Sequence, residues 1–119
     1  MRVTKVFQWD AAHQLFLPYE SKCNSLHGHT YLVEIELEGL VNEDGMVMDF
    51  ADLKRIVEPA SFDHKHLNSI PWFAGKNPTA ENIVLYLKDV LDRNWKPQWA
   101  NIRRIRVYET PTSFAEEEW

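Results

Sequence analysis

The most restrictive feature of this sequence is a regular alternation of apolar and acidic residues between positions 29 and 40. One parity holds Tyr31, Val33, Ile35 and Leu37, and the other holds Glu34, Glu36 and Glu38. Because successive side chains of a strand point to opposite faces, this pattern predicts a strand with one buried and one solvated face. Such a strand is typical of an antiparallel sheet whose apolar face is covered by other elements.

Further strands and helices are predicted around this stretch. Strand period is found over residues 3–13 and 102–110, and residues 113–119 are expected to form a short last strand. Asp49 and Thr79 are typical N-cap residues, and each precedes a stretch with helical spacing of apolar residues. The predicted order is strand, strand, helix, helix, strand, strand. We therefore expect an α+β fold, an antiparallel sheet with two helices on one face, in a single domain over residues 1–119.

Composition and charge argue against several classes of function. Cys23 is the only cysteine, so an internal disulfide is impossible. The net charge of −5 argues against a general nucleic-acid binder. The longest uninterrupted apolar stretch, Ile83–Leu87, is too short for a membrane span, and residues 1–5 do not resemble the start of a signal peptide. We expect a cytoplasmic protein that binds neither nucleic acid nor membranes.

The strongest local signal for chemistry is the segment His27-Gly28-His29. Histidines two residues apart on a strand project from the same face, and Gly28 leaves room between them. His13 lies at the far end of the first predicted strand, on the parity of its apolar face. Three imidazoles that meet leave one position of a tetrahedral zinc ion open, as in catalytic zinc sites. His64 and His66 are an alternative source of ligands, and spacing does not decide between the two sets.

Three further positions have more than one interpretation. Cys23 is either a fourth zinc ligand that closes the site or a free thiol that acts as a base. Asp63-His64 is either a carboxylate–imidazole relay or a solvated turn. Glu109 has the parity of an apolar face, where a carboxylate needs a partner. It is either an anchor for an amidine-like ligand edge or a strand end that reaches solvent.

Together these pieces resemble the 6-pyruvoyltetrahydropterin synthase family, and more closely its bacterial 6-carboxytetrahydropterin synthase branch. The matching segments, in chain order, are Trp9-Asp10-Ala11-Ala12-His13, Cys23-x-x-x-His27-Gly28-His29-x-Tyr31, Gly45-Met46-Val47-Met48-Asp49-Phe50, Phe62-Asp63-His64-x-x-Leu67-Asn68, Asn77-Pro78-Thr79-x-Glu81-Asn82 and Val107-x-Glu109-Thr110. Each segment alone is a weak signal, but their joint occurrence in this order is strong. The spacing between Cys23 and His27 is that of the 6-carboxy branch. Trp9 and His66 depart from the family's usual Phe and Tyr, and neither change removes a proposed functional group.

The resemblance implies a tunnelling fold and a set of site residues. The implied roles are zinc ligands for His13, His27 and His29, general acid/base for Cys23, a second proton-transfer pair for Asp63 and His64, and binding of the pyrimidine edge of a pterin for Glu109 with help from Thr79. Tunnelling-fold subunits join their sheets into trimeric barrels that stack as hexamers. The resemblance therefore implies a homo-oligomer with active sites between its subunits.

The implied substrate is 7,8-dihydroneopterin triphosphate. In the 6-carboxy branch the reaction releases acetaldehyde and triphosphate, on the route to 7-deazaguanine and queuosine, with zinc acting as a Lewis acid beside the side-chain hydroxyl groups. Lys22, Lys54 and Lys65 are the candidates for binding the triphosphate. One alternative is the 6-pyruvoyl reaction, which eliminates triphosphate and keeps the side chain. Another is a non-catalytic, zinc-stabilised pterin-binding module closed by the Cys23 thiolate.

Overall fold

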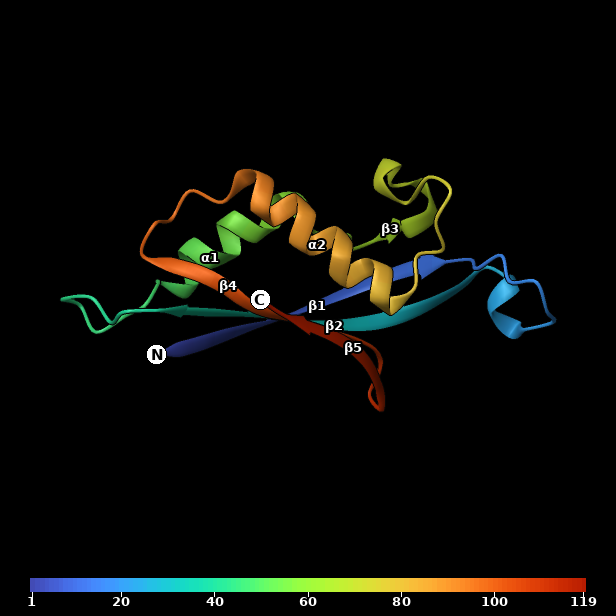
Figure 1. Cartoon of the computed structure of the whole chain (residues 1–119). Coiled ribbons are helices and arrows are strands. Elements are labelled where there is room, and N and C mark those ends of the chain that lie inside the picture. Colours follow the sequence, from blue (N-terminus) through green and yellow to red (C-terminus); the bar gives the residue numbers. More distant parts are fainter.

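Five strands and two α-helices make up the computed structural model, which describes residues 1–119 (Figure 1). The elements are, in chain order, β1 (Arg2–His13), β2 (His27–Gly39), α1 (Phe50–Val57), β3 (Lys65–His66), α2 (Ala80–Asn94), β4 (Ala100–Thr110) and β5 (Ser113–Glu118), with short 3₁₀ turns between them. The strands form one sheet in the order β3-β1-β2-β4-β5. The predicted α+β fold and the order of its long elements are confirmed.

The alternation in β2 has the structural result that it predicts. Its apolar residues Tyr31, Val33, Ile35 and Leu37 are completely buried, at 0% exposure. β2 pairs antiparallel with β1 on one side and with β4 on the other, so it lies between them in the sheet. Burying a large apolar side chain contributes about 1.5–3 kcal/mol. A slip of one residue would turn this row to solvent, so the pattern holds the register in place.

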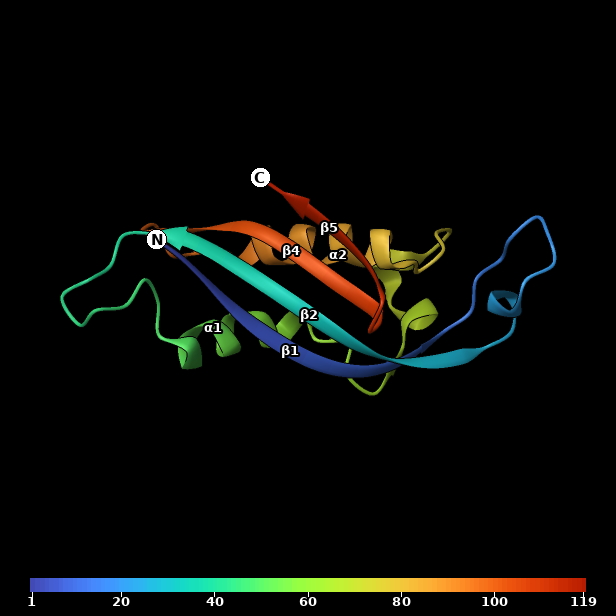
Figure 2. The ribbon, with the colours of Figure 1, turned by 90° about the horizontal axis from the view of Figure 1, so that it is seen from below.

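Both helices cover the same face of the sheet, as Figures 1 and 2 show from two directions. α1 begins after Asp49, whose carboxylate accepts a hydrogen bond from the Ala51 N–H at 2.8 Å. α2 begins after Thr79, whose hydroxyl accepts one from the Asn82 N–H at 3.2 Å. The buried helix side chains, which include Leu53, Val57, Ile83, Leu87 and Leu91, join the apolar row of β2 in one core cluster. Both helices lack the length and apolar character that crossing a membrane requires.

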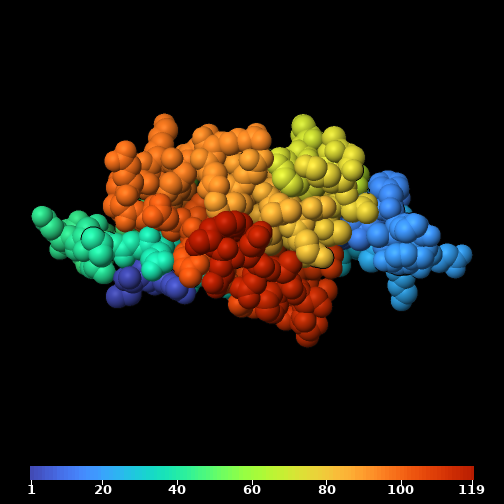
Figure 3. Space-filling view, in the orientation of Figure 1, coloured from blue at the N-terminus to red at the C-terminus, as the bar shows by residue number.

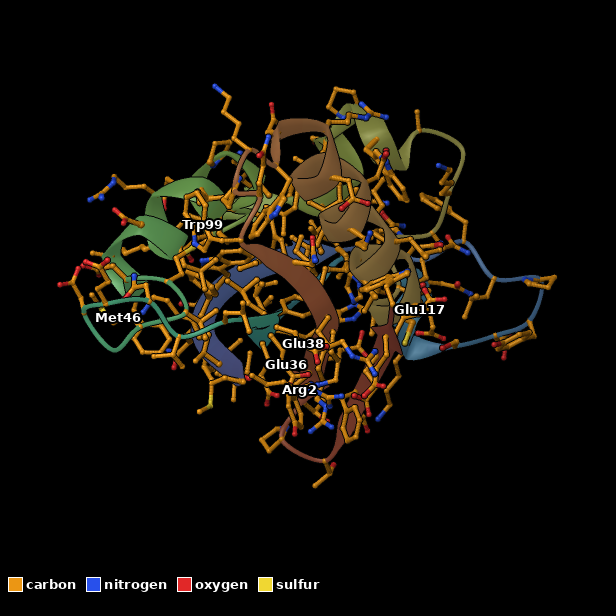
Figure 4. The ribbon with its side chains drawn as sticks, turned by 60° about the vertical axis from the view of Figure 1, so that its left-hand side comes forward. Arg2, Glu36, Glu38, Met46, Trp99 and Glu117 are labelled. Atoms are coloured by element: carbon orange, nitrogen blue, oxygen red, sulfur yellow. The ribbon has the colours of Figure 1, made fainter.

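The uncovered face of the sheet carries a ladder of charged side chains. Arg104 on β4 contacts Glu34 at 3.1 Å and Glu36 at 3.2 Å on β2. Arg106 pairs instead with Glu116 at 3.1 Å, because β5 brings that carboxylate directly opposite it. Figure 4 shows Glu36 on this side of the sheet, away from the helices. The ladder replaces apolar packing on the face that no helix covers.

The sequence pattern does not reveal the short strand β3. It pairs in parallel with β1, Lys65 with Ala11 and His66 with Ala12. Two residues cannot display an alternation, so only the tertiary pairing shows this strand. The sheet is thus antiparallel in its long strands, with one short parallel pair at an edge. The loop between β1 and β2 and the loop between β2 and α1 project from opposite ends of the molecule (Figures 1 and 3).

Candidate active site

Three histidine side chains meet where β1 ends and β2 begins. Their ligand nitrogens all lie within 4.8 Å of one another. The antiparallel register places His13 directly opposite His27, and His29 follows two residues later on the same face of β2. The structure therefore brings His13, His27 and His29 together within one chain, because strand register and strand period coincide at this end of the sheet.

Backbone carbonyl groups determine which nitrogens of His13 and His27 are free. The Pro78 carbonyl lies 2.8 Å from His13 Nδ1, and the Ser25 carbonyl lies 2.6 Å from His27 Nδ1. A carbonyl only accepts hydrogen bonds, so each Nδ1 carries the proton and each neutral ring presents a lone pair on Nε2. The two Nε2 atoms are 2.9 Å apart. Two lone pairs repel each other at this distance, so the contact is favourable only with a cation between them.

His29 adds a third nitrogen without a partner. Its Nε2 is buried and forms no hydrogen bond. Burial lowers the pKa of both His13 and His29, and the Glu109 carboxylate opposes this effect in part. Metal ions bind the neutral form of imidazole. Three neutral nitrogen donors, one of them orphaned, fit a divalent transition-metal ion, and these histidines form a cluster that can hold one.

Glu109 reaches the histidine cluster from β4. Its Oε1 lies 3.4 Å from His13 Nε2 and 3.5 Å from His29 Nε2, and its side chain is 30% exposed. Glu109 also lines a depression of about 400 Å³ together with His29, Thr30 and Tyr108. The carboxylate therefore faces the histidine cluster, and the residue that carries it borders a depression at the end of β4.

Sequence reasoning does not single out Tyr31 as a site residue. The ring is completely buried, and its hydroxyl lies 3.3 Å from His13 Nδ1. Burial raises the pKa of Tyr31, and the nearby Glu109 carboxylate adds to the shift. The hydroxyl therefore stays protonated and contacts His13 on the edge opposite the free Nε2. The available signal is its position two residues after His29, on the same parity.

Asp63 and His64 lie in the turn before β3, next to Asp10 of β1. Asp63 Oδ1 accepts a hydrogen bond from the Asp10 N–H at 2.9 Å, and Asp63 Oδ2 lies 3.7 Å from His64 Nε2. The His64 side chain is 82% exposed. His64 and His29 line the same depression, of about 670 Å³. One member of each group, His64 and His29, thus borders the same open space.

The second pair of histidines does not form a comparable cluster. His64 and His66 are both exposed, and neither belongs to a group of three imidazoles. His64 is grouped with Asp10 and Asp63, whereas His66 lies 3.4 Å from the Ser69 hydroxyl. Of the two ligand sets that spacing leaves open, the structure favours the one built from β1 and β2.

Cys23 lies in a 3₁₀ turn, Lys22–Asn24, of the loop between β1 and β2. It is half-buried, and its carbonyl accepts a hydrogen bond from the Leu15 N–H at 2.8 Å. Its thiol is not among the ligand atoms that converge with the three imidazoles. Within one chain, this geometry favours an open three-nitrogen site over a site closed by the thiolate.

Thr79 is connected to the cluster through its neighbour in the chain. Its hydroxyl caps α2, and the carbonyl of the preceding Pro78 is the group that binds His13 Nδ1. The beginning of α2 therefore helps to hold the imidazole in place. The contact expected between Thr79 and a pterin stays a prediction.

Comparisons with known proteins agree with this architecture. Residues 2–118 match the family model described as 6-pyruvoyl tetrahydropterin synthase. A protein of Archaeoglobus fulgidus, provisionally named 6-carboxy-5,6,7,8-tetrahydropterin synthase, is 44% identical over 110 residues, covering 91% of this chain and 87% of that protein. The 6-carboxy-5,6,7,8-tetrahydropterin synthase of Haemophilus influenzae is 33% identical over 140 residues, covering 97% of this chain and 96% of that protein. The solved structure of 6-pyruvoyl tetrahydropterin synthase from Caenorhabditis elegans is similar with a TM-score of 0.86 at 27% identity, covering 100% of this chain and 95% of that one.

Proposed function

The chain belongs to the 6-pyruvoyl tetrahydropterin synthase family, and on that basis we propose that it is a zinc-dependent carbon–carbon lyase. The proposed substrate is 7,8-dihydroneopterin triphosphate. With one molecule of water, the products are 6-carboxy-5,6,7,8-tetrahydropterin, acetaldehyde and triphosphate. We assign this reaction to the cytoplasm, on the route to 7-deazaguanine and queuosine.

The convergence of unprotonated imidazole nitrogens is the observation that carries this proposal. His13, His27 and His29 would hold the ion, since their Nε2 atoms are directed at one another and lack protein partners suited to lone pairs. A site with three protein ligands keeps a coordination position for substrate, as catalytic zinc sites do. When bound, the ion supplies Lewis acidity beside the hydroxyl groups of the substrate side chain.

Proton transfer is assigned to Cys23, Asp63 and His64. Cleavage of the side chain requires protons to be removed from and returned to groups next to the pterin ring, and each transfer needs a side chain within hydrogen-bond reach. Asp63 Oδ2, at 3.7 Å from His64 Nε2, orients the imidazole. Cys23 supplies a second group, from the loop that leads into His27.

Glu109 is proposed to bind the pyrimidine edge of the pterin, with assistance from Thr79. A carboxylate accepts two charge-assisted hydrogen bonds from the amidine-like N–H groups of that edge. Glu109 and His29 both border the depression of about 400 Å³ between β2 and the end of β4, which supports this proposal. A ring bound there would extend its side chain toward His29.

The proposed assembly is a homohexamer, a dimer of trimeric barrels, with active sites between subunits. The exposure of His64 and the separation of the Cys23 thiol from the imidazoles support this assembly. Within a single chain these proton-transfer groups stand apart from the site that they would serve. A neighbouring subunit that covers His64 would close the depression it shares with His29.

The proposed triphosphate ligands differ in their positions. Lys65 lines the depression that contains His29 and His64, which supports its role in binding phosphate. Lys54 lines another depression together with Asp63 and Lys65, which no histidine lines. Lys22 neighbours Cys23 in the 3₁₀ turn. Of the three candidates, Lys65 therefore has the strongest structural support.

Product analysis tests the reaction itself. Purified protein loaded with zinc is incubated with 7,8-dihydroneopterin triphosphate, and acetaldehyde, triphosphate and pterin products are quantified. The 6-carboxy reaction releases acetaldehyde and triphosphate in equal amounts. Triphosphate without acetaldehyde would assign the 6-pyruvoyl reaction instead, and the absence of both products would contradict the proposal.

A cysteine variant tests the non-catalytic alternative. In Cys23→Ala, zinc content measured by elemental analysis should stay at the wild-type level while turnover falls, because the thiol transfers protons and does not ligate the ion. Loss of zinc from this variant would indicate a site closed by the thiolate. Unchanged turnover would remove Cys23 from the mechanism.

A further inference from the structure

His64 adopts a strained backbone conformation. Its φ of 58° makes it the only residue other than glycine with a positive φ in the chain. A residue with a Cβ atom in the left-handed region costs on the order of 1–3 kcal/mol, and it persists only where surrounding contacts hold it. The residues whose contacts hold His64 in this conformation are therefore the ones that can position it for a function.

Asp10 is the residue that holds this turn through its backbone. Its carbonyl accepts a hydrogen bond from the His64 N–H at 2.6 Å, and its N–H donates to Asp63 Oδ1 at 2.9 Å. Directly after the turn, Lys65 pairs with Ala11 in the parallel β3–β1 ladder. The two backbone groups of Asp10, its N–H and its carbonyl, thus hold Asp63 and His64 respectively.

The Asp10 side chain brings a second carboxylate to the same place. It accepts a hydrogen bond from the Thr30 hydroxyl at 2.6 Å, which fixes its orientation. The ligand atoms of Asp10, Asp63 and His64 all lie within 4.8 Å of one another. Neither carboxylate forms an ion pair with a lysine or arginine. Asp10 and His64 border the depression of about 670 Å³ described above, and the other titratable groups that border it are His29, Lys65 and His66.

We propose that Asp10 is a positioning residue for the Asp63–His64 pair, with Thr30 orienting its carboxylate. Its carboxylate lies within 4.8 Å of the His64 ring nitrogen, where it faces the charge that develops during proton transfer, and its backbone fixes the turn that holds the ring beside Asp63. The proton moves between substrate and His64, and Asp10 itself neither gains nor loses one. This inference rests on the function proposed above, because it assigns Asp10 a role in that reaction.

The first test removes the charge and keeps the shape. Asp10→Asn retains the backbone contacts and an oxygen that accepts from Thr30. Because exposed charges a few ångströms apart interact by up to about 1 kcal/mol, kcat should fall roughly fivefold, with KM and zinc content unchanged. Asp44→Asn, a matched loss of one negative charge in an exposed turn, should leave kcat unchanged. An Asp10→Asn enzyme with wild-type kcat would overturn the inference.

A double-mutant cycle shows whether Asp10 acts through His64. His64→Asn keeps a residue that tolerates a positive φ but cannot transfer a proton. In the His64→Asn background, Asp10→Asn should cause no further loss of kcat, because its partner is already gone. An equal fivefold loss in both backgrounds would assign Asp10 a role independent of His64 and contradict the proposal. Thr30→Val, which frees the carboxylate without removing it, should lower kcat less than Asp10→Asn does.

A measurement without substrate separates this inference from the proposed reaction. The ring carbon shifts of His64 are followed by NMR in the substrate-free protein. They should change in Asp10→Asn and stay constant in Asp44→Asn. If the wild-type protein fails to cleave the pterin, the reaction is wrong while this result still decides the role of Asp10. Unchanged ring carbon shifts in Asp10→Asn would contradict it.

Discussion

The imidazole of His13 is completely buried, whereas that of His64 is 82% exposed. Both belong to the same end of β1: His13 is its last residue, and the His64 N–H donates to the Asp10 carbonyl. His13 belongs to the helix-covered side of the sheet, where burial and backbone carbonyls leave its Nε2 as a bare lone pair. His64 belongs to a strained turn at the sheet edge, where solvent reaches both the ring and its carboxylate partner.

The two environments suit different chemistry. A buried, neutral imidazole with a fixed tautomer is a good metal ligand and a poor proton carrier. An exposed imidazole beside carboxylates gains and loses a proton easily. The cluster of His13, His27 and His29 is also complete within one chain, because the pairing register of β1 with β2 and the period of two along β2 bring its three imidazoles together. The exposed pair borders open space, and its function depends on what covers that space.

The largest expected effect on zinc binding and turnover comes from removing a ligand of the histidine cluster. His27→Ala should abolish zinc uptake and reduce turnover by more than about 100-fold. At a free zinc concentration of roughly 1,000 times the dissociation constant, zinc should stabilise the wild-type protein by about 4 kcal/mol, and this gain should vanish in the variant. Thermal unfolding with and without zinc measures it. His66→Ala, a control at an exposed histidine of β3, should keep the full gain in stability. Zinc binding by His27→Ala would contradict the assignment of His27 as a metal ligand.

The exposed pair should respond in the opposite way. His64→Asn should lower kcat by about 100-fold, as expected for loss of a general acid or base, while zinc content and the zinc-dependent rise in Tm stay at wild-type values. Steady-state kinetics and elemental analysis on the same preparation check both. Loss of zinc from this variant would mean that the two clusters are not separate.

A smaller effect on zinc affinity is expected from Tyr31, which contacts the His13 ring of the histidine cluster. Tyr31→Phe removes the hydroxyl 3.3 Å from His13 Nδ1 and leaves the Pro78 carbonyl in place. Loss of an outer contact to a metal ligand costs 10–100-fold in affinity, so with one contact retained we expect about a tenfold weaker zinc affinity. Competition with a chelating dye measures it. Tyr108→Phe, whose hydroxyl contacts Arg106, is the control and should not change the affinity.

The smallest effect concerns the start of α2. Thr79→Ala removes the helix cap and should reduce the free energy of unfolding by about 1 kcal/mol, which denaturant titration detects. Thr112→Ala, at an exposed turn that caps no helix, should have less effect. The KM of the Thr79 variant tests its predicted contact with the pterin: a higher KM supports that contact, and an unchanged KM assigns Thr79 to the helix alone.

Sequence patterns are sufficient for most of the fold because they report local physics. The parity of Tyr31 and Val33 requires one face of β2 to be buried, and the Asp49 and Thr79 caps place the helices that bury it. The charged ladder is predictable only in part. Arg104 contacts the acidic row of β2. Arg106 pairs with Glu116 instead, and this depends on the register in which β5 pairs with β4.

The sequence pattern predicts the long strands, the apolar face of β2 and the projection of His27 and His29 from that face, because a period of two along a strand separates its two faces. Which imidazole nitrogens are free, and which groups Asp63 and His64 contact, depends instead on residues that are distant in the chain. The Pro78 carbonyl that fixes His13 is 65 residues away in the chain, and the Asp10 N–H that binds Asp63 is 53 residues away. Contacts of this range are made by backbone groups that every residue type carries, so no local pattern of side chains encodes them.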